Sequence, residues 1–576
     1  MQADRQSSLH PVFNDGRVWL VSAMIVSLII SAVYYITHPY PAYGAGLFLA
    51  MADQIQATGY HFPTTIPHYT LGGVPFAYPP LQFFVVAVLL DLGADPLLLT
   101  RVLPGSIIAL YLIPFYALAK EILGSVQIAG LATVILAATP DVLSWHLSAG
   151  GIVRAPAYLL LLTGLYSGVR LFKTGQRQWL ASSVVLFGLM VLSHPTYTSF
   201  FATSYLLLYV AYDRSLLGLV RGASVAAGGF ILAAPWWTHV LNNYGMATIT
   251  GAAATHEGLI NELPLIIARL SGPFHAGNAI LVWNVLIFVG IAVLLWRREG
   301  VLPAWFALAV LVMNEPRFPL VPGVMLAAVA LHSLLTHQLG DGTDADWQQW
   351  RSVARWGIRG SVVVVVGFMI FVGGVYASGS LVGGGPSMVS FIDDDDMTTM
   401  DWVQNETPPD AKFVVLGDAG EWFPYFTDRT MLVGRWGVEW TTPAEYRAQL
   451  TKYWELSTCH TEQCLTETLH RHNVNPEYVY VPTEQYAALG IVQHQPPSMR
   501  QTLVDSERYQ LEHESEGAAV FRVVGEQDIT RENSSHSQST SSRRTTTAIT
   551  TENVGDGVAF DQFNQRPSTK HSTGPR

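Results

Sequence analysis

Apolar residues fill long stretches from Arg17 to about Ser380, and polar residues are largely confined to the gaps between them. Roughly 20 apolar residues are the length that an α-helix needs to cross about 30 Å of hydrocarbon. The pattern therefore predicts about eleven membrane-crossing helices. We place them at 17–36, 99–119, 122–140, 152–172, 179–196, 197–213, 217–237, 279–296, 301–313, 318–337 and 360–380.

The stretch 81–92 is too short to belong to this set. It holds about a dozen apolar residues after Pro79 and Pro80, and a helix of that length covers only about 18 Å. The basic residues decide its placement, because short loops rich in Lys and Arg face the cytoplasm. If 81–92 does not cross, the basic groups all face inward: Lys120, Arg170, Lys173, Arg177, Arg214, Arg221, Arg297, Arg298, Arg351, Arg355 and Arg359. We therefore expect an interfacial helix on the outer surface.

The same count of crossings gives the domain organisation. Residues 1–16 form a cytoplasmic N-terminus, and residues 17–380 form the transmembrane domain of a multi-pass plasma-membrane protein. Because the number of crossings is odd, the part after Ser380 is extracytoplasmic, together with the external loops 38–98 and 239–278. Residues 527–576 are rich in Ser and Thr and cannot bury a core, so we expect them to be disordered.

Residues 381–526 have the pattern of a small α/β domain. Strand-like runs occur at 412–416, 429–435, 476–482 and 518–524, and helix-like runs occur at 396–405, 443–456 and 466–472. The four adjacent carboxylates Asp393 to Asp396, just before the first helix, are typical of a solvated spacer. The fold class is thus a polytopic α-helical membrane protein with an extracytoplasmic α/β domain.

Composition supports the membrane assignment. Half of the 576 residues are hydrophobic and only 13% are charged, whereas soluble domains carry about 25% charged residues. The formal net charge of −11 argues against a nucleic-acid partner.

Cys459 and Cys464 are close enough for a local disulfide outside the cell. A zinc site with His460, His470 and His472 is the alternative.

The first external loop contains a second candidate interfacial helix. In 43–57 the apolar residues Leu47, Phe48, Met51 and Ile55 recur at helical spacing, and polar residues take the other positions. Two surface-lying helices joined by a linker rich in aromatic residues, Pro and Gly are suited to frame a groove for a lipid-linked substrate. A packing cap over the helix bundle is the alternative.

Several motifs of the outer face resemble one enzyme family. They are "YPPL" (78–81), "LSAGGIVRA" (147–155), "RFP" (317–319) and the C-terminal domain. Together they resemble the GT-C superfamily of membrane glycosyltransferases, which includes protein O-mannosyltransferases, aminoarabinose transferases and oligosaccharyltransferases. The resemblance extends to about residue 525. It implies hexosyl transfer from a polyprenyl-phosphate-linked donor to a protein, lipid or glycan acceptor on the extracytoplasmic face.

Such a reaction requires cations for the phosphate leaving group, and Arg binds phosphate in a bidentate manner. Arg154 and Arg317 lie at outer ends of predicted helices, where the positive-inside trend disfavours Arg. We therefore expect both to bind the donor phosphate. The alternatives are pairing with a carboxylate such as Glu315, or contact with lipid headgroups. We expect the substrate groove to include Tyr43, His68, Tyr78, Gly150, Gly151 and His194.

The reaction also requires a base that activates the acceptor. The resemblance implies an acidic residue near the start of the first interfacial helix, but this chain has Tyr43, Gly44 and Ala45 there. The nearest carboxylate is Asp53, which we take as the candidate catalytic residue. His68, Glu257 and Glu262 are further external candidates. Paired Asp-x-Asp ligands are missing from the turn 141–154, which argues against dependence on a divalent metal.

The missing acid leaves two other classes of function open. A non-catalytic GT-C-derived protein would bind lipid-linked glycan or assist surface polymer assembly. A transporter is less favoured, because ionisable residues inside the predicted helices are scarce. In the C-terminal domain, the aromatic residues Trp422, Phe423 and Tyr425 could bind the acceptor or pack against the membrane domain.

Overall fold

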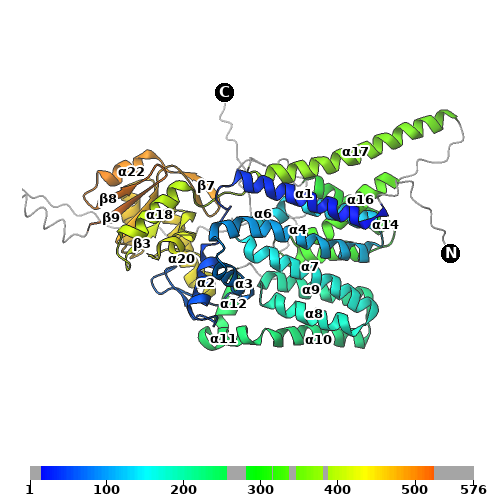
Figure 1. The fold of residues 1–576 in the computed structure, drawn as a ribbon, viewed down its shortest axis with the longest axis horizontal. Helices are drawn as coiled ribbons and strands as arrows, with labels where there is room; N and C mark the ends of the chain where they lie inside the picture. Colours follow the sequence, from blue (N-terminus) through cyan, green and yellow to red (C-terminus); the bar gives the residue numbers. More distant parts are fainter. Residues whose placement is uncertain (1–13, 256–280, 314, 337–344, 380–386, 525–576) are drawn as a thin grey trace, which may run out of the picture. The chain divides into compact units, whose positions relative to one another are not determined.

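Each predicted membrane segment is helical in the part of it that the structure describes (Figure 1). The helices are α1 (Gly16–Thr37), α4 (Pro96–Leu123), α5 (Val126–Ala137), α7 (Gly151–Thr174), α8 (Arg177–Val191), α9 (Pro195–Tyr212), α10 (Leu216–Leu232), α14 (Leu281–Trp296), α15 (Val301–Val312), α16 (Leu320–Thr336) and α17 (Ala345–Ala377). Two segments are bent: α5 continues into α6 (Pro140–His146) at 56°, and α10 into α11 (Ala234–Tyr244) at 60°.

The number of crossings stays a prediction. Among the helices that the structure describes, four are long and apolar enough to cross a membrane, or up to six when each bent pair counts as one span. Several of the others are apolar but shorter, such as α15 and α16. The structure is a computed structural model that describes residues 14–255, 281–313, 315–336, 345–379 and 387–524. Glu257, Glu262 and the predicted tail 527–576 lie outside these ranges.

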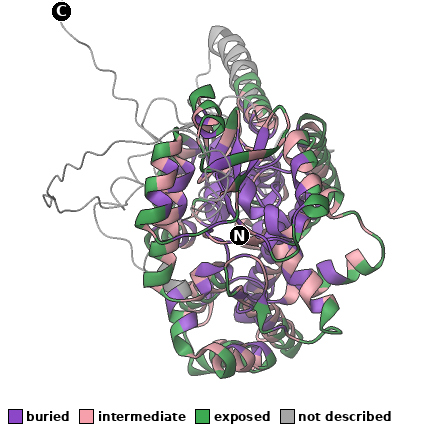
Figure 2. Ribbon diagram, turned by 90° about the vertical axis from the view of Figure 1, so that its left-hand side faces the viewer, coloured by how far each residue is buried: buried purple, intermediate pink, exposed green. Residues whose placement is uncertain are grey.

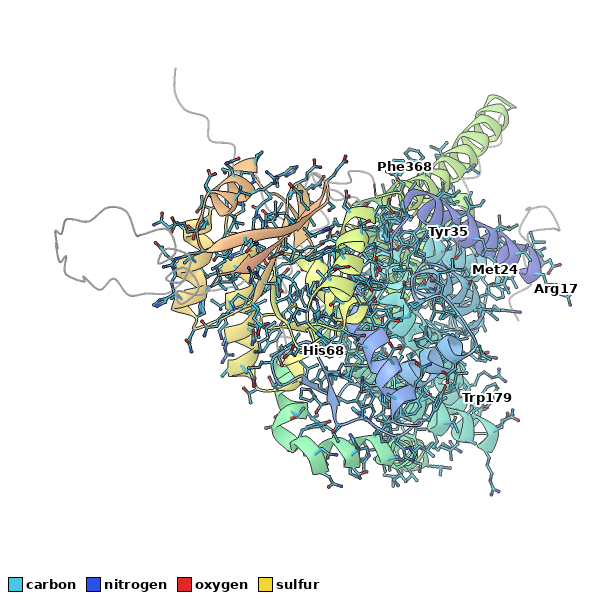
Figure 3. All side chains as sticks on the ribbon, turned by 60° about the vertical axis from the view of Figure 1, so that its left-hand side comes forward. Arg17, Met24, Tyr35, His68, Trp179 and Phe368 are labelled. Atoms are coloured by element: carbon cyan, nitrogen blue, oxygen red, sulfur yellow. A yellow bond between two sulfur atoms is a disulfide. The ribbon has the colours of Figure 1, made fainter. Side chains whose placement is uncertain are left out.

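The loop between α1 and α4 begins and ends at the same end of the helix bundle. Arg101, in the first turns of α4, donates to the carbonyl of Tyr35 near the end of α1 at 2.9 Å. At the other end of the pair, the start of α1 at Gly16 lies against Tyr116. The two helices are therefore antiparallel, and Figure 3 shows Arg17 and Tyr35 at the two ends of α1. A crossing at 81–92 would make α1 and α4 parallel, so this antiparallel geometry agrees with the prediction that 81–92 does not cross the membrane.

The two short helices of this loop pack against each other. They are α2 (Gly46–Ala57) and α3 (Leu81–Asp91), with the β-strands β1 (Thr65–Ile66) and β2 (Val74–Pro75) between them in sequence. Gln56 of α2 donates to the carbonyl of Ala87 in α3 at 2.9 Å. The first amide of α3 donates to the carbonyl of Leu192, just before α9, at 2.9 Å. The apolar stripe predicted for 43–57 is therefore buried against protein.

The C-terminal region contains the predicted sheet. Its strands run in the order β4-β3-β5-β9-β8, with β3 parallel to β4 and β5, and β9 antiparallel to β5 and β8. They are β3 (Lys412–Val415), β4 (Thr430–Met431), β5 (Tyr478–Pro482), β8 (Tyr509–Glu514) and β9 (Ala518–Val523). The sequence pattern does not predict β8 or the hairpin of β6 (Gln485–Ala488) and β7 (Ile491–His494), because their side chains are largely polar or half exposed.

Helices surround this sheet: α18 (Asp394–Glu406), α19 (Phe423–Thr427), α20 (Pro443–Ser457), α21 (Glu462–Arg471) and α22 (Pro497–Val504). The spacer predicted at Asp393 to Asp396 was wrong. Asp393 caps α18 by accepting from the amides of Asp395 and Asp396, each at 3.0 Å. Carboxylates favour a helix N-terminus because the first amides there have no partner within the helix.

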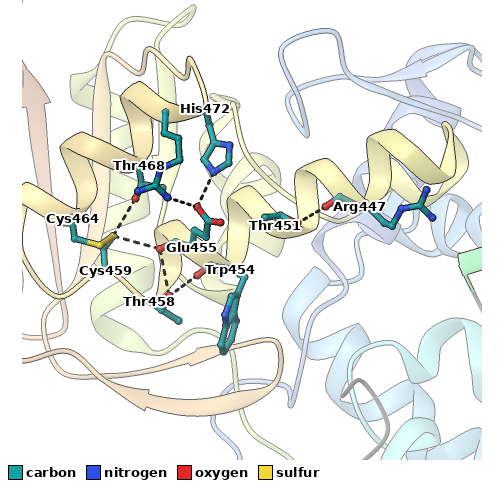
Figure 4. Close-up of polar contacts among 10 residues, drawn as sticks. Arg447, Thr451, Trp454, Glu455, Thr458, Cys459, Cys464, Thr468 and His472 are labelled. Atoms are coloured by element: carbon teal, nitrogen blue, oxygen red, sulfur yellow. Dashed lines mark hydrogen bonds and ion pairs between the residues drawn. A yellow bond between two sulfur atoms is a disulfide. The ribbon is translucent and has the colours of Figure 1, made fainter. Parts of the chain in front are cut away.

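The predicted disulfide between Cys459 and Cys464 is present and joins the end of α20 to α21 (Figure 4). Two of the three histidines of the zinc alternative have other partners. His472 pairs with Glu455 at 2.8 Å, and His460 contacts the side-chain oxygen of Gln495 at 2.7 Å. Both cysteines are therefore used for the covalent link rather than as metal ligands.

A hydrophobic core connects the first external loop to the C-terminal domain. It includes buried residues of α2, of α3 and of the sheet, such as Leu49, Phe83 and Val414. Figure 2 shows the buried residues along the inner faces of the elements. A further short helix from the loop after α11, α12 (Met246–Thr255), contacts α20 and the 3-10 helix η4 (Val438–Trp440). The C-terminal domain is thus packed over the end of the bundle where α4 and α7 begin.

Candidate functional site

The two predicted phosphate-binding arginines converge on one aromatic ring. The guanidinium carbon of Arg154, in the first turn of α7, lies 4.9 Å from the ring centroid of Trp145 in α6. That of Arg317, just before α16, lies 5.8 Å from the same ring. Contact with an aromatic face stabilises a cation without using its N–H donors. The ring therefore lies close to two positive charges, and this contact itself uses none of their N–H donors.

Arg317 is fixed on several sides. Its side chain is almost fully buried, and its guanidinium also lies 5.3 Å from the ring of Tyr197 and 5.0 Å from that of Phe318. The predicted alternative partner Glu315 forms an ion pair with one terminal nitrogen at 3.3 Å. The buried Nε of Arg317 has no hydrogen-bond partner within the described ranges. A buried donor without a partner is rare in proteins and is consistent with a site that binds a ligand.

Gly150 and Gly151 have packing functions in this arrangement. A side chain at Gly150 would overlap the guanidinium of Arg154, so the glycine lets that group fold back over the turn. A side chain at Gly151 would overlap the carbonyl of His146 and lie 2.9 Å from Pro104. The space that these glycines provide is therefore occupied by the protein itself, and they position Arg154.

Three of the predicted groove residues surround the arginine pair. Tyr43 stacks on Trp145 with ring centroids 5.7 Å apart. Tyr78 contacts His194 at 5.8 Å and Trp440 of η4 at 5.4 Å. His194 in turn lies 4.8 Å from Tyr197, which also contacts Arg317. Segments distant in sequence are thus assembled around the two charges.

The remaining two predicted site residues, Asp53 in α2 and His68, both lie near Asp428, the residue that follows α19. His68 Nδ1 contacts the hydroxyl of Thr430 at 3.0 Å, and its carbonyl accepts from Met431 at 2.9 Å. Burial and the nearby charge of Asp428 raise the pKa of Asp53 to about 6. Neither residue contacts Arg154 or Arg317 within the described part of the chain.

A carboxylate that the sequence analysis did not select lies at Gly44. It belongs to Glu421, the last residue of the 3-10 helix η3 (Asp418–Glu421), and a side chain at Gly44 would overlap it. Glu421 is 9% exposed. Burial raises its pKa to about 8, and Arg435 and Arg154 partly offset this effect. A carboxyl group whose pKa is raised by burial, with cations nearby, is common at functional sites.

The sequence signal for Glu421 was present but was interpreted for its aromatic residues only. In "GEWFPYFTDR" Trp422 is fully buried, and its indole donates to the carbonyl of Tyr43 at 3.2 Å. The packing alternative is therefore correct for Trp422. Packing of this tryptophan against the segment before α2 is what brings the preceding carboxylate to Gly44.

Among the described residues, no three His, Cys, Asp or Glu side chains are arranged to hold a metal ion. The chemistry that the described site offers is therefore that of two guanidinium groups and a buried carboxylate within an aromatic setting. Such a set can bind an anionic group and accept a proton.

No protein-family model matches this chain, and no curated protein matches its sequence. Solved structures do match. The apo oligosaccharyltransferase of Archaeoglobus fulgidus gives a TM-score of 0.54 at 12% identity, over 83% of this chain and 70% of that one. The A. fulgidus oligosaccharyltransferase AglB, in complex with an inhibitory peptide and a dolichol-phosphate, gives 0.52 at 14% identity, over 87% and 80%.

ArnT from Cupriavidus metallidurans, bound to undecaprenyl phosphate, gives a TM-score of 0.47 at 15% identity, over 88% of this chain and 98% of that one. At these identities the likeness concerns the fold. The fold resemblance that the sequence motifs indicated is confirmed: the structural neighbours of this chain are GT-C membrane glycosyltransferases.

Proposed function

We propose that the protein is a membrane glycosyltransferase that moves a sugar from a polyprenyl-phosphate-linked donor to a protein, lipid or glycan acceptor on the extracytoplasmic face. The observation that supports this most is the convergence of Arg154 and Arg317 on Trp145. Arg154 comes from α7 and Arg317 from the turn before α16, and two like charges beside one ring repel each other. The phosphate of a polyprenyl-linked donor, bound by both arginines, would offset that repulsion.

In this function the arginines stabilise the leaving group. When the bond from the sugar to the phosphate oxygen breaks, negative charge develops on the phosphate. Fixed guanidinium groups lower the energy of that state without reorganising, and their planar fork matches phosphate oxygens. The single contact of Arg317 with Glu315 involves one terminal nitrogen, so other N–H groups remain for the phosphate.

The solved neighbours support the class of substrate. AglB was solved in complex with an inhibitory peptide and a dolichol-phosphate, and a crystal structure of an A. fulgidus oligosaccharyltransferase contains a tethered acceptor peptide. By analogy of fold we propose that this chain binds a polyprenyl-phosphate carrier from the membrane lipid phase and uses a protein or glycan acceptor.

The proposed sidedness follows from the charges at the two ends of the bundle. At the end opposite to Arg154, Glu121 pairs with Arg170 at 3.1 Å and with Lys173 at 3.2 Å, and Arg221 pairs with Asp213 at 3.0 Å. Basic residues gather on the cytoplasmic side. The arginine pair and the C-terminal domain are therefore assigned to the extracytoplasmic side.

The test compares lipid-linked and protein-linked surface glycans, by mass spectrometry, in cells with and without the gene. We expect a glycan shortened by one defined sugar and accumulation of its lipid-linked donor. Reintroduced Arg154→Ala or Arg317→Ala should restore transfer about 10²-fold less well than wild type, because one charge-stabilising donor typically contributes that much. Unchanged glycans in the deletion strain would contradict the proposal and favour a binding or assembly function.

Asp53 remains the base that the sequence alone predicts. If Asp53 were the base, reintroduced Asp53→Asn would restore little transfer at an unchanged protein level. Normal transfer by this variant would exclude Asp53 as the base.

A further inference from the structure

We propose that Glu421 is the catalytic base of the transfer, and that the C-terminal domain supplies it at the place where the external loop has Gly44. This inference rests on the proposed function. The proposed reaction needs a group that removes the acceptor proton, and the loop around Gly44 contains no acidic residue that could do so.

The fit between Gly44 and Glu421 is the first argument. A Cβ atom at position 44 would overlap the carboxylate of Glu421 and would lie 2.7 Å from its Cγ. The backbone of Gly44 is not in the left-handed region, so the conformation alone does not require glycine there. Glycine is needed at position 44 because the side chain of Glu421 fills the space. A side chain at position 44 and the observed carboxylate exclude each other.

Second, the backbone of Glu421 is held in place from the loop side. Its carbonyl accepts from the hydroxyl of Tyr69 at 2.9 Å, and a side chain at Gly46 would overlap this carbonyl. The next residue, Trp422, donates to the carbonyl of Tyr43 at 3.2 Å. A catalytic group has to be held within about 0.5 Å of its working position, and contacts of this kind provide that.

Third, Glu421 lies near the proposed phosphate site. Gly44 directly follows Tyr43, whose ring stacks on Trp145, and Trp145 carries both arginines. The charge of Arg154 also acts on the carboxyl group of Glu421 and lowers its pKa against the larger effect of burial. The carboxylate and the proposed leaving-group site are therefore neighbours.

A comparison with Asp418, in the same 3-10 helix, separates a structural carboxylate from this one. Asp418 accepts from the hydroxyl of Tyr453 at 2.6 Å and from the amide of Gly490 at 2.6 Å, and lies 3.8 Å from Arg435. Within the described ranges, no hydrogen bond or ion pair to the side chain of Glu421 is recorded. A buried carboxylate without such partners lowers stability, which is typical of groups that are kept for function.

The step can be written with its atoms balanced. The oxygen or nitrogen of the acceptor forms a bond to the anomeric carbon, and its proton moves to the carboxylate of Glu421. The bond between the anomeric carbon and the phosphate oxygen breaks, and the electron pair leaves with the polyprenyl phosphate. Arg154 and Arg317 stabilise that anion. The base returns its proton to solvent before the next cycle.

The charged groups that act on Glu421 come from several elements: Arg435, Asp418, Arg154 and Glu439. Glu439, in η4, is itself a carboxylate whose pKa is raised by burial to about 7. It is the competing base in this part of the site. A test has to separate Glu421 from Glu439 and from Asp53.

The experiment reintroduces variants into the deletion strain and measures the lost glycan and the accumulated donor by mass spectrometry, at matched protein levels. Glu421→Gln should lower transfer at least 10²-fold, because it keeps the shape and removes the base. Glu477→Gln, an exposed carboxylate of the same domain that pairs with Lys412, serves as the control and should restore transfer fully. If Glu421→Gln also restores transfer fully, Glu421 is not the base. If transfer is instead lost only in Asp53→Asn, or only in Glu439→Gln, the residue replaced in that variant is the base.

A relocation variant separates catalysis from folding. Gly44→Asp should abolish transfer, because its side chain overlaps Glu421 and adds a like charge. The double variant Gly44→Asp with Glu421→Ala should regain at least 10-fold over either single variant, since it returns one carboxylate to the same space. Failure of the double variant, when it is present at the wild-type level and still binds the lipid-linked donor, would overturn the inference. An unaltered glycan in the deletion strain would instead contradict the proposed function itself.

Discussion

Replacement of Glu421 by Gln should stabilise the protein in a pH-dependent way. Burial raises the pKa of this carboxyl from its ordinary value of 4.5 to about 8. Between these two values the folded state binds more protons at this site than the unfolded state, so the free energy of unfolding falls as the pH rises. The free-energy cost of ionising this buried carboxyl is absent below its ordinary pKa of 4.5 and is complete above its raised pKa of about 8. Glutamine does not titrate, so the variant lacks this cost.

The magnitude follows from the difference between the two pKa values. Each pKa unit corresponds to about 1.4 kcal/mol, so the ionised carboxylate costs up to about 5 kcal/mol above pH 8 and about 2 kcal/mol at pH 6. The difference in the free energy of unfolding between Glu421→Gln and wild type should thus grow by up to about 3 kcal/mol between pH 6 and pH 9. Local relaxation around the charge reduces the expected growth to roughly 1 to 3 kcal/mol.

The assay is thermal unfolding of the full chain in detergent, with the midpoint compared between wild type and variant at pH 6 and pH 9. Glu477→Gln is the matched control, because that carboxylate is about half exposed and should show no such growth. A midpoint difference for Glu421→Gln that is the same at both pH values would refute the reasoning. It would mean that the carboxylate is hydrated or paired in the folded protein.

Three further predictions test the geometry. Gly46→Ala should lower the free energy of docking of the C-terminal domain by about 1 to 3 kcal/mol, because the added Cβ would lie 2.8 Å from the Cα of Trp422. Limited proteolysis should cleave this variant faster than the control Gly72→Ala, where no atom lies within 4 Å of the added Cβ. Leu92→Cys, 79% exposed, should react with a membrane-impermeant thiol reagent in intact cells, whereas Leu216→Cys, 82% exposed at the other end of the bundle, should react only after permeabilisation. Cys464→Ser should lower stability by about 2 kcal/mol, the value for a short closed loop, and reductant should have the same effect on wild type but none on the variant.

Local patterns predicted most of the helices and strands. Long apolar runs gave the helical segments, and the distribution of basic residues placed 81–92 outside the set of crossings, in agreement with the antiparallel contact of Arg101 with Tyr35. The bends between α5 and α6 and between α10 and α11 were not predicted. An apolar run continues through such a bend, because lipid and a protein core select the same residue types.

The positions of the two arginines in sequence predicted both of them as site residues, because charge on the outer ends of apolar helices is unusual. Their common contact with Trp145 could not be predicted, since it depends on how α6, α7 and α16 pack. Asp53 was chosen for its nearness in sequence to Gly44. The structure puts a residue 377 positions later in the chain, Glu421, in that space instead.

If Glu421 is the base, the active site is complete only when the C-terminal domain is docked on the external loop. The hydrogen bonds from Tyr69 to Glu421 and from Trp422 to Tyr43, together with the shared core, hold that docked state. Burial in the same interface raises the pKa of Glu421, so docking itself makes the carboxylate a stronger base. The pH dependence of transfer should therefore follow the docked state, with transfer rising as the pH increases toward about 8 and the carboxyl loses its proton. A variant that loosens docking should therefore lower two quantities: the maximum rate of transfer, and the pH at which transfer reaches half of that maximum. If Glu421 had only a structural function, such a variant would change the maximum rate alone.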